Sequence, residues 1–315
     1  MNNSPMVSVI VATYNQKDVV AQALQSIVDQ SYDNLEIIIS DDCSSDGTQS
    51  ILTDFSERHP RVVLFLQKKN LGITANYNFL TEKCSGKYVA TFAGDDVMLP
   101  NKIKQQVDAL EADEGSSFCH HAVTILDYHS NVPGKTLTRK YVNNITTIHD
   151  VLRGFGIPGS MTLMYRRSLV TNPAFEPSIL VASDWFQIIK LAMSGRGIYI
   201  DESLCFYRQD SEYNGKDPSS YEDDFLTTIA KTRTLYATPG DEIDKSCDYA
   251  RARYFLGAGF RRLANGEGAK SRAALKYPLK HLSLFFPASI IFMISYASLP
   301  MRVLSVGRKL FRFFS

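Results

Sequence analysis

Residues 89–96 read Val-Ala-Thr-Phe-Ala-Gly-Asp-Asp, so an apolar segment leads directly to two adjacent carboxylates, Asp95 and Asp96. A short run of β-forming residues predicts a buried strand. Two acidic side chains at the end of such a strand are costly unless they bind something positive. Carboxylate oxygens suit Mg²⁺ or Mn²⁺, which keep positions open for the phosphates of a nucleotide. The segment therefore predicts a metal and nucleotide site at the end of a strand.

Two earlier segments, 7–12 and 35–40, repeat this design. The residues that follow them are polar or acidic: Thr13, Tyr14 and Asn15 after the first, and Asp41 and Asp42 after the second. The carboxyl ends of parallel strands share one edge of a sheet, which is where open α/β sheets bind nucleotides. Helically spaced apolar residues separate the strands, and a further strand is expected at about 62–66. The first half of the chain thus predicts an α/β fold with a mainly parallel sheet.

The second half is predicted to be more helical. A strand is expected over 117–126, followed by an irregular polar segment over 127–146 with Pro133-Gly134 as a turn. A helix should follow Asp184, and the stretch 221–280 has a helical pattern. These patterns suggest three parts: a catalytic domain over 1–220, a helical extension over 221–281 and a tail over 282–315.

Composition places the chain among ordinary folded proteins. Of its 315 residues 44% are hydrophobic and 21% charged, and the net charge of +1 gives no indication of nucleic-acid binding. The five cysteines are scattered and contain no C-x-x-C, which argues against disulfides or zinc and for a reducing compartment. The first residues lack the pattern of a signal peptide.

The C-terminal end has a different character. Eight basic residues and no acidic residue follow Glu267, and the stretch between His281 and Arg302 is uncharged. From Met301 onward a helical projection puts basic residues on one face and apolar ones on the other, as in helices that lie in a membrane interface. We therefore expect peripheral or monotopic membrane association, with 282–300 embedded shallowly. A helix docked on the protein's own core is the alternative.

Several motifs in sequence order carry a resemblance to a known family. They are Thr13-Tyr14-Asn15, the segment 40–48 with Asp41-Asp42, Asn70-Leu71-Gly72, and Gly86-Lys87-Tyr88 leading to Gly94-Asp95-Asp96. Together they resemble the family 2 glycosyltransferases of the GT-A fold, over about residues 5–210. The resemblance implies a Rossmann-like sheet flanked by helices. It also implies inverting transfer of a sugar from a nucleotide-sugar, usually with a divalent metal ion.

The resemblance also implies roles for individual residues. Asp96 would be the more direct metal ligand, with Asp95 facing ribose or metal. Asp42 would bind the base, since a carboxylate can accept a hydrogen bond from a uracil N–H. Tyr77 stands where an arginine is common in the family. The expected nucleotide-binding residues are Ala12, Thr13, Tyr14, Asn15, Asp41, Asp42, Asn70, Gly72, Asp95 and Arg208.

Ser183-Asp184-Trp185 resembles the family's acidic pair ahead of a helix, with serine in place of the first acid. Asp184 matches the catalytic base, which takes the proton of the acceptor hydroxyl. The alternative is an aspartate that only caps the helix. Trp185 could stack on a sugar or simply pack. Arg208 lies in a closing segment, 206–210, in which Asp210 replaces the usual histidine.

The leading interpretation is an inverting, metal-dependent hexosyltransferase at the cytoplasmic face of the inner membrane, similar to bacterial enzymes of surface-polysaccharide synthesis. Its donor would be a nucleotide-sugar, with UDP-sugars favoured, and its acceptor a glycan or lipid-linked glycan. A sugar nucleotidyltransferase is less favoured because the first turn lacks a Gly-rich, Arg/Lys-bearing loop. A dehydrogenase is disfavoured because no G-x-G-x-x-G follows the first strand. A membrane-bound nucleotide-sugar binder without transfer activity is the non-enzyme alternative.

Overall fold

The computed structural model describes residues 4–209, 221–280 and 285–294. In this part of the chain ten strands form one sheet, whose main path has the order β3-β2-β1-β4-β9-β6-β10-β5. The strands that run in one direction are β1 (Val7–Thr13), β2 (Leu35–Asp41), β3 (Val62–Leu66), β4 (Tyr88–Ala93), β6 (Ser116–Asp127) and β10 (Arg196–Gln209). The strands of opposite direction are β5 (Val97–Met98), β7 (Pro133–Leu137), β8 (Ile145–Thr146) and β9 (Met164–Arg166). The sheet is mixed and mainly parallel, as predicted.

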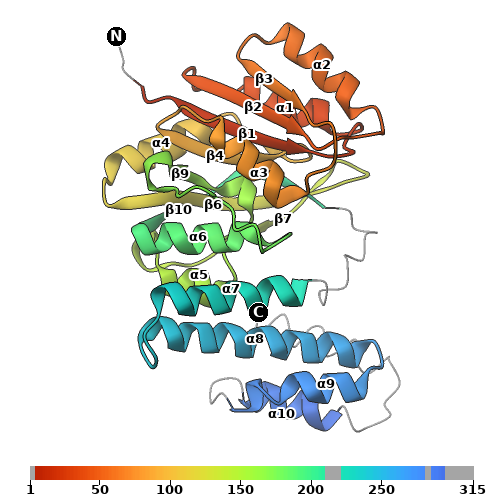
Figure 1. The fold of residues 1–315 in the computed structure, drawn as a ribbon, viewed down its shortest axis with the longest axis vertical. Coiled ribbons are helices and arrows are strands. Elements are labelled where there is room, and N and C mark those ends of the chain that lie inside the picture. Colours follow the sequence, from red (N-terminus) through yellow and green to blue (C-terminus); the bar gives the residue numbers. More distant parts are fainter. Residues whose placement is uncertain (1–3, 210–220, 281–284, 295–315) are drawn as a thin grey trace.

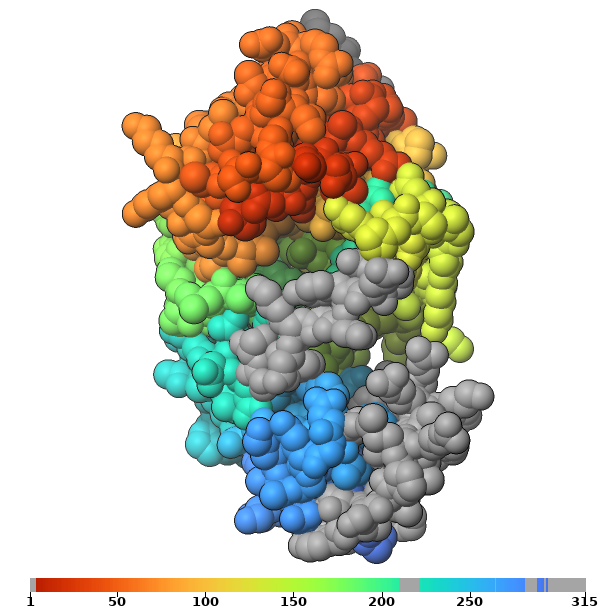
Figure 2. Space-filling model, turned by 90° about the vertical axis from the view of Figure 1, so that its right-hand side faces the viewer, coloured from red at the N-terminus to blue at the C-terminus, as the bar shows by residue number. Residues whose placement is uncertain are grey.

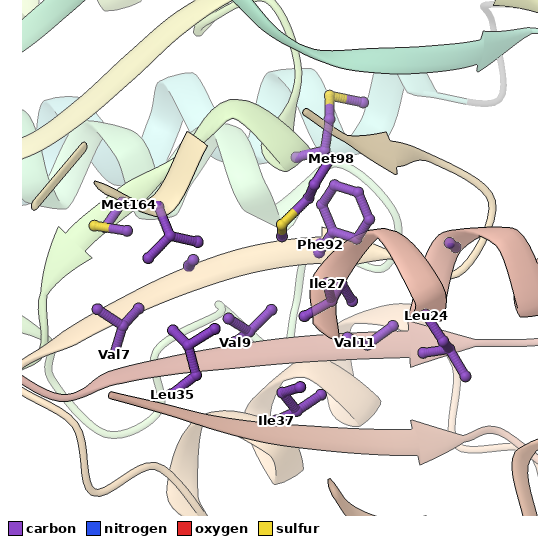
Figure 3. Close-up of a cluster of buried hydrophobic side chains, with 14 of the residues drawn as sticks. Val7, Val9, Val11, Leu24, Ile27, Leu35, Ile37, Phe92, Met98 and Met164 are labelled. Atoms are coloured by element: carbon purple, nitrogen blue, oxygen red, sulfur yellow. The ribbon is translucent and has the colours of Figure 1, made fainter. Parts of the chain in front are cut away.

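Helices cover both faces of the sheet (Figure 1). In β1, Val9 and Val11 point into one core and Ile10 into the other, as the alternation of side chains along a strand requires. The first core includes residues of α1 (Val20–Val28), α2 (Thr48–Arg58) and α4 (Lys102–Ala112) (Figure 3). The second includes residues of α3 (Ile73–Glu82), α5 (Ile148–Gly154) and α6 (Ser183–Ser194). Short 3-10 helices span Val142–Asn144, Ser160–Thr162, Arg167–Leu169 and Pro278–Lys280.

The C-terminal helices stack below the sheet domain (Figure 1). They are α7 (Glu222–Tyr236), α8 (Glu242–Ala264), α9 (Gly268–Leu275) and α10 (Phe285–Ile294). Phe225 of α7 stacks on Trp185 of α6 at 5.3 Å between ring centres, and on Tyr254 of α8 at 4.1 Å. Aromatic packing therefore ties the helical extension to the first turn of α6.

One expectation about the second half of the chain needs correction. Residues 127–146 are not wholly irregular, because Pro133-Gly134 opens the edge strand β7 instead of forming a turn. An edge strand tolerates proline, whose missing N–H would face away from the neighbouring strand.

Part of the segment 282–300 forms the helix α10. Its residues Ala288 and Ile291 are buried against Leu256, Leu263 and Leu275, so this helix packs on α8 and α9. This packing crosses the domain boundary expected at residue 282, and the membrane embedding of 282–300 stays a prediction. No helix in the described ranges is long and apolar enough to cross a membrane. The amphipathic segment predicted from residue 301 onward lies outside the described residues.

Candidate functional site

The carboxyl ends of β1, β2 and β4 meet at the right-hand side of Figure 1, the face seen in Figure 2. Thr13 and Asp41 are register partners in β1 and β2, and the Thr13 hydroxyl donates to Asp41 Oδ2 at 3.0 Å. Ala12 pairs with Ala93 of β4, and its carbonyl accepts from Gly94 N at 3.1 Å. The sheet register thus places all three predicted strand ends side by side.

The loops after β1 and β2 are hydrogen-bonded to each other. Asn15, which has a φ of 51°, donates its backbone N–H to Ser44 Oγ at 2.8 Å, and Asn15 Oδ1 accepts from Ser45 N at 3.0 Å. Asparagine is one of the few residues that adopt this left-handed conformation readily. Tyr14 stays 50% exposed beside this loop pair. The arrangement leaves its ring available to a ligand.

Asp41 and Asp42 have different surroundings. Asp41 is fully buried, and its carboxylate accepts hydrogen bonds from Thr13, Ser44 and Gln49. Asp42 accepts from Leu71 N at 2.6 Å and Gly72 N at 3.0 Å. Asn70 Oδ1 also accepts from Gly72 N, at 3.0 Å. Asp41 therefore fixes its own loop, while Asp42 holds the 70–72 segment at the edge of the site.

Asp95 and Asp96 lie in the turn between β4 and β5. Asp96 is 1% exposed, its Oδ1 accepts from Arg208 N at 2.9 Å, and its buried Oδ2 has no hydrogen-bond partner within the described part of the chain. Burial, and then the neighbouring Asp95 carboxylate, raise the pKa of Asp96 well above the usual range for an aspartate. Burial raises the pKa of Asp95 as well. A buried, unpartnered carboxylate oxygen is what a metal ion would satisfy.

Arg208 supports this acidic turn from β10. Its guanidinium is 6% exposed and donates to Asp95 O at 2.8 Å, to Asn131 Oδ1 at 2.9 Å and to Gln22 Oε1 at 2.5 Å. None of these three acceptors is a carboxylate oxygen, so the guanidinium does not occupy the unpartnered Oδ2 of Asp96. The structure gives Arg208 a positioning role, and its contact with a phosphate stays a prediction.

Gly94 is required by the close approach of the β4 end to the loop after β1. A Cβ atom at this position would lie 2.4 Å from Gln16 Oε1 and 2.6 Å from Thr13 Cγ2. We expect Gly94→Ala to cost about 1–3 kcal/mol of unfolding free energy, because the loop must move to admit the methyl group. Urea denaturation measures this cost. Gly134→Ala, where the nearest atom is at 3.6 Å, is the control and should change stability by less than about 0.5 kcal/mol. Equal effects at both positions would contradict the steric argument.

Asp184 lies in the first turn of α6, where its Oδ1 accepts from Trp185 N at 2.8 Å. Burial raises its pKa above the usual range for an aspartate, although the Trp185 N–H opposes this shift. The preceding residues are anchored by Asp224 of α7, whose carboxylate accepts from Leu180 N, Val181 N and Ala182 N at 2.8–3.1 Å. Asp184 is therefore held at a fixed point and has a pKa suited to accepting a proton.

Two tyrosines, Tyr77 and Tyr207, lie within electrostatic range of Asp95, Asp96 and Asp184. Tyr77 of α3 donates to Phe92 O at 3.0 Å, and its pKa is raised first by burial and then by the charges of Asp95, Asp96 and Asp184. The pKa of Tyr207 is raised by burial and by the same three carboxylates. These acids come from two distant parts of the chain, and the charges of all three contribute to the pKa of both tyrosines. The predicted metal pair and the predicted base thus lie within electrostatic range of the same two side chains.

This site fits a divalent metal ion of the Mn²⁺ or Mg²⁺ type. Asp96 offers the unpartnered oxygen described above, and Asp95 lies beside it. Across the described ranges no three His, Cys, Asp or Glu side chains gather as a closed metal cage. Such ions commonly keep their other positions for phosphate and water. The residues present therefore suit a metal held jointly with a diphosphate.

Some predicted candidates do not face the site. Trp185 is 7% exposed, donates its indole N–H to Val151 O at 3.1 Å and packs on Phe155 and Phe225. The structure therefore favours the packing alternative over stacking on a sugar. The cysteines in this structure are all free, as expected.

Sequence reasoning missed the residues that position the acids. Gln22 and Asn131 bind Arg208 from 186 and 77 residues away, and Asp224 lies 42 residues from Ala182. No local pattern joins such positions, so only the fold could reveal them. For Asp224, the sequence offers only its place among the acidic residues that open α7.

A mainly parallel sheet with acids at its carboxyl edge and a helical C-terminal part is the architecture of the GT-A glycosyltransferases. The family description "Glycosyl transferase family 2" matches residues 8–171, and the chain belongs to this family of glycosyltransferases.

Among relatives, the chain is 30% identical over 213 residues to the putative teichuronic acid biosynthesis glycosyltransferase TuaG of Bacillus subtilis, covering 66% of this chain and 80% of TuaG. It is 38% identical over 112 residues to the putative glycosyltransferase EpsE of the same organism, covering 35% of this chain and 40% of EpsE.

Two solved structures share the fold. S. aureus TarS residues 1–349, solved in complex with UDP-GlcNAc, aligns with a TM-score of 0.67 and 16% identity, over 96% of this chain and 92% of that one. The mannosyltransferase PcManGT of Pyrobaculum calidifontis, in complex with GDP-Man and Mn²⁺, aligns with a TM-score of 0.59 and 19% identity, over 98% of this chain and 88% of that one. Both neighbours bind a nucleotide-sugar at this fold.

Proposed function

We propose that this glycosyltransferase moves a sugar from a nucleotide-sugar, with UDP-sugars favoured, to a glycan or lipid-linked acceptor with inversion at the anomeric carbon. The single observation that carries the proposal is the buried Asp96 carboxylate beside Asp95, whose Oδ2 has no hydrogen-bond partner among the residues that the structure describes. Asp95 and Asp96 suit a metal ion that binds the diphosphate, and Asp184 suits proton transfer. The UDP- and GDP-sugar complexes of the structural neighbours agree with this donor class.

In this mechanism the donor lies along the carboxyl edge of the sheet. Tyr14, 50% exposed, stacks on the base, and the loop held by Asp42 lies beneath the nucleotide. A divalent ion bound at Asp95 and Asp96 would stabilise the negative charge of the leaving diphosphate. Arg208 keeps the acidic turn in place through Asp95 O and the backbone bond to Asp96.

Asp184 then acts on the acceptor. Its carboxylate takes the proton of the acceptor hydroxyl as the new bond to the anomeric carbon forms and the bond to the diphosphate breaks. Attack from the face opposite the leaving group inverts the anomeric configuration. Fixed support from Asp224 and a raised pKa both favour this role. The turnover assay at the end of the Discussion tests the proposal.

We also propose that the enzyme works at the cytoplasmic face of the inner membrane, attached by its basic C-terminal segment. The support comes from the sequence: Arg302, Arg308, Lys309 and Arg312 share one helical face, opposite aliphatic and aromatic residues. Each cation near an anionic leaflet contributes on the order of 1 kcal/mol, and buried aromatics add an apolar contribution.

Deleting residues 295–315 should abolish binding to phosphatidylglycerol vesicles. This deletion keeps α10, whose Ala288 and Ile291 belong to the helical core, so donor binding should be preserved. Replacing the four cations by glutamate should weaken attachment most strongly at low salt. Vesicle co-sedimentation measures both effects. If the full chain ignores anionic vesicles at low salt, the membrane proposal is wrong.

A further inference from the structure

A basic cavity lies between the segment after β7, the helix α5 and the helix α8. Its volume is about 590 Å³. The segment from β7 to α5, coloured yellow to yellow-green, runs down one side of the face shown in Figure 2. The charged side chains that line the cavity are four cations and one acid: Arg139, Lys140, Arg153, Arg253 and Asp150.

Backbone carbonyls and an aromatic ring contact the arginines of this basic cavity. Arg139 Nη2 donates to Gly154 O at 3.1 Å, and Arg253 Nη1 donates to Arg153 O at 2.6 Å. The Arg153 guanidinium lies 5.7 Å from the ring centre of Tyr249. For Arg139 and Arg153, these carbonyl and ring contacts orient the guanidinium and leave its full charge in place.

The single acid does not neutralise this charge. Asp150 is the capping residue of α5, and its Oδ2 accepts from Thr147 N at 2.8 Å and from Thr147 Oγ1 at 2.6 Å. Considering only the residues described, no ion pair joins a carboxylate to Arg139, Lys140 or Arg153. The cavity is therefore pre-organised and positively charged.

Two ring contacts connect this cavity to the proposed catalytic base. The Arg253 guanidinium lies 5.2 Å from the ring centre of Phe155, and the Phe155 ring centre lies 5.9 Å from that of Trp185. Trp185 directly follows Asp184, whose Oδ1 its N–H contacts. The cavity therefore lies a few side chains away from Asp184, at a place suited to a more distant unit of an extended saccharide acceptor.

We propose that the basic cavity binds a phosphate or carboxylate group of the saccharide acceptor, so that the enzyme elongates or decorates an anionic glycan. The planar guanidinium groups match the oxygens of either anion. Tyr141 and Tyr249 also line the cavity. This inference rests on the proposed function, because it assigns the acceptor of that same site.

The experiment measures binding of fluorescent glycerol-phosphate and galacturonate oligomers to the full chain by anisotropy, with neutral dextran as a reference. The double variant Lys140→Gln/Arg153→Gln removes two exposed cations, of which Arg153 contacts the Tyr249 ring of α8. The matched control Arg58→Gln/Lys104→Gln removes two exposed cations from α2 and α4. We expect the double variant in the cavity to weaken binding of at least one oligomer about tenfold or more, because charge-assisted contacts are lost. The control variant should weaken binding by less than about twofold.

Equal binding of both oligomers by the two variants would overturn the proposal. Binding of both variants to phosphatidylglycerol vesicles is measured in parallel. If the double variant loses only vesicle binding, the anion is a lipid headgroup and the proposal is overturned. Calorimetric titration with UDP, performed on the same proteins, separates this question from the proposed function. A chain that binds the oligomers through the cavity but no nucleotide refutes the donor assignment and leaves the anion site intact.

Discussion

Asp184→Asn should reduce sugar transfer by a factor of about 10² or more while leaving donor affinity close to that of the wild type. The amide is nearly the same size as the carboxylate, and its oxygen can still accept the hydrogen bond from Trp185 N. It cannot take a proton from the acceptor hydroxyl at neutral pH. Initial rates with a saturating donor, together with calorimetry of the donor, measure the two quantities.

A control separates chemistry from positioning. Asp224→Asn keeps one oxygen, which can still accept from Val181 N and Ala182 N, but it places an NH₂ group opposite Leu180 N and removes the charge from all three hydrogen bonds. It should lower thermal stability and affect the rate less than Asp184→Asn does. Activity of Asp184→Asn within a few-fold of the wild type would show that Asp184 only supports the helix, and that another acid is the base.

Asp96→Asn should weaken Mn²⁺-dependent donor binding by at least a factor of ten, or about 1.4 kcal/mol. The asparagine can keep the hydrogen bond from Arg208 N at Oδ1, but it puts an NH₂ group where Oδ2 is now unpartnered. The same change should leave thermal stability unchanged or raise it. Burial and repulsion from Asp95 disfavour the charged carboxylate in the metal-free protein, and the amide removes that penalty.

The raised pKa also sets the direction of a pH effect. The metal binds the deprotonated carboxylate, so donor affinity in Mn²⁺ should increase as the pH rises through the elevated pKa of Asp96. In EDTA this dependence should disappear. Asp113→Asn, at a partly buried acid that pairs with Arg196 away from the acidic turn, is the control and should behave like the wild type. A donor affinity that is the same in Mn²⁺ and EDTA, and unaffected by Asp96→Asn, would refute the metal site.

The main strands of the sheet could be predicted because each of them is an apolar segment that can be recognised in the sequence by itself. The apolar segments ending near Thr13, Asp41 and Ala93 became β1, β2 and β4, and their parallel register brought the polar ends together. Strand β9, only three residues long, is inserted antiparallel between β4 and β6. Periodicity cannot detect so short an element. Nor could it identify β7, whose exposed edge position permits a Pro-Gly opening that elsewhere indicates a turn.

Of the site, only the acidic residues could be predicted from the sequence, and the residues that hold them in place could not. Positions such as Asp96 and Asp184 could be found because acids at strand ends and before helices follow local patterns. Their supports could not, since Gln22, Asn131 and Asp224 act across long separations in the chain. The basic cavity could not be predicted for the same reason. Arg139, Arg153 and Arg253 come together only when the segment after β7 and the helices α5 and α8 pack in the folded chain.

Release of nucleoside diphosphate from UDP-, GDP- and dTDP-sugars in Mn²⁺, followed with radiolabelled donor, tests the central claim most directly. The account predicts turnover of at least one donor by the wild type, with water or an anionic glycan as acceptor. It also predicts that Asp184→Asn binds this donor but fails to turn it over. Tight binding of a donor by the wild type without any turnover, in Mn²⁺ or Mg²⁺ and with every acceptor, would contradict the account and indicate a nucleotide-sugar binder instead.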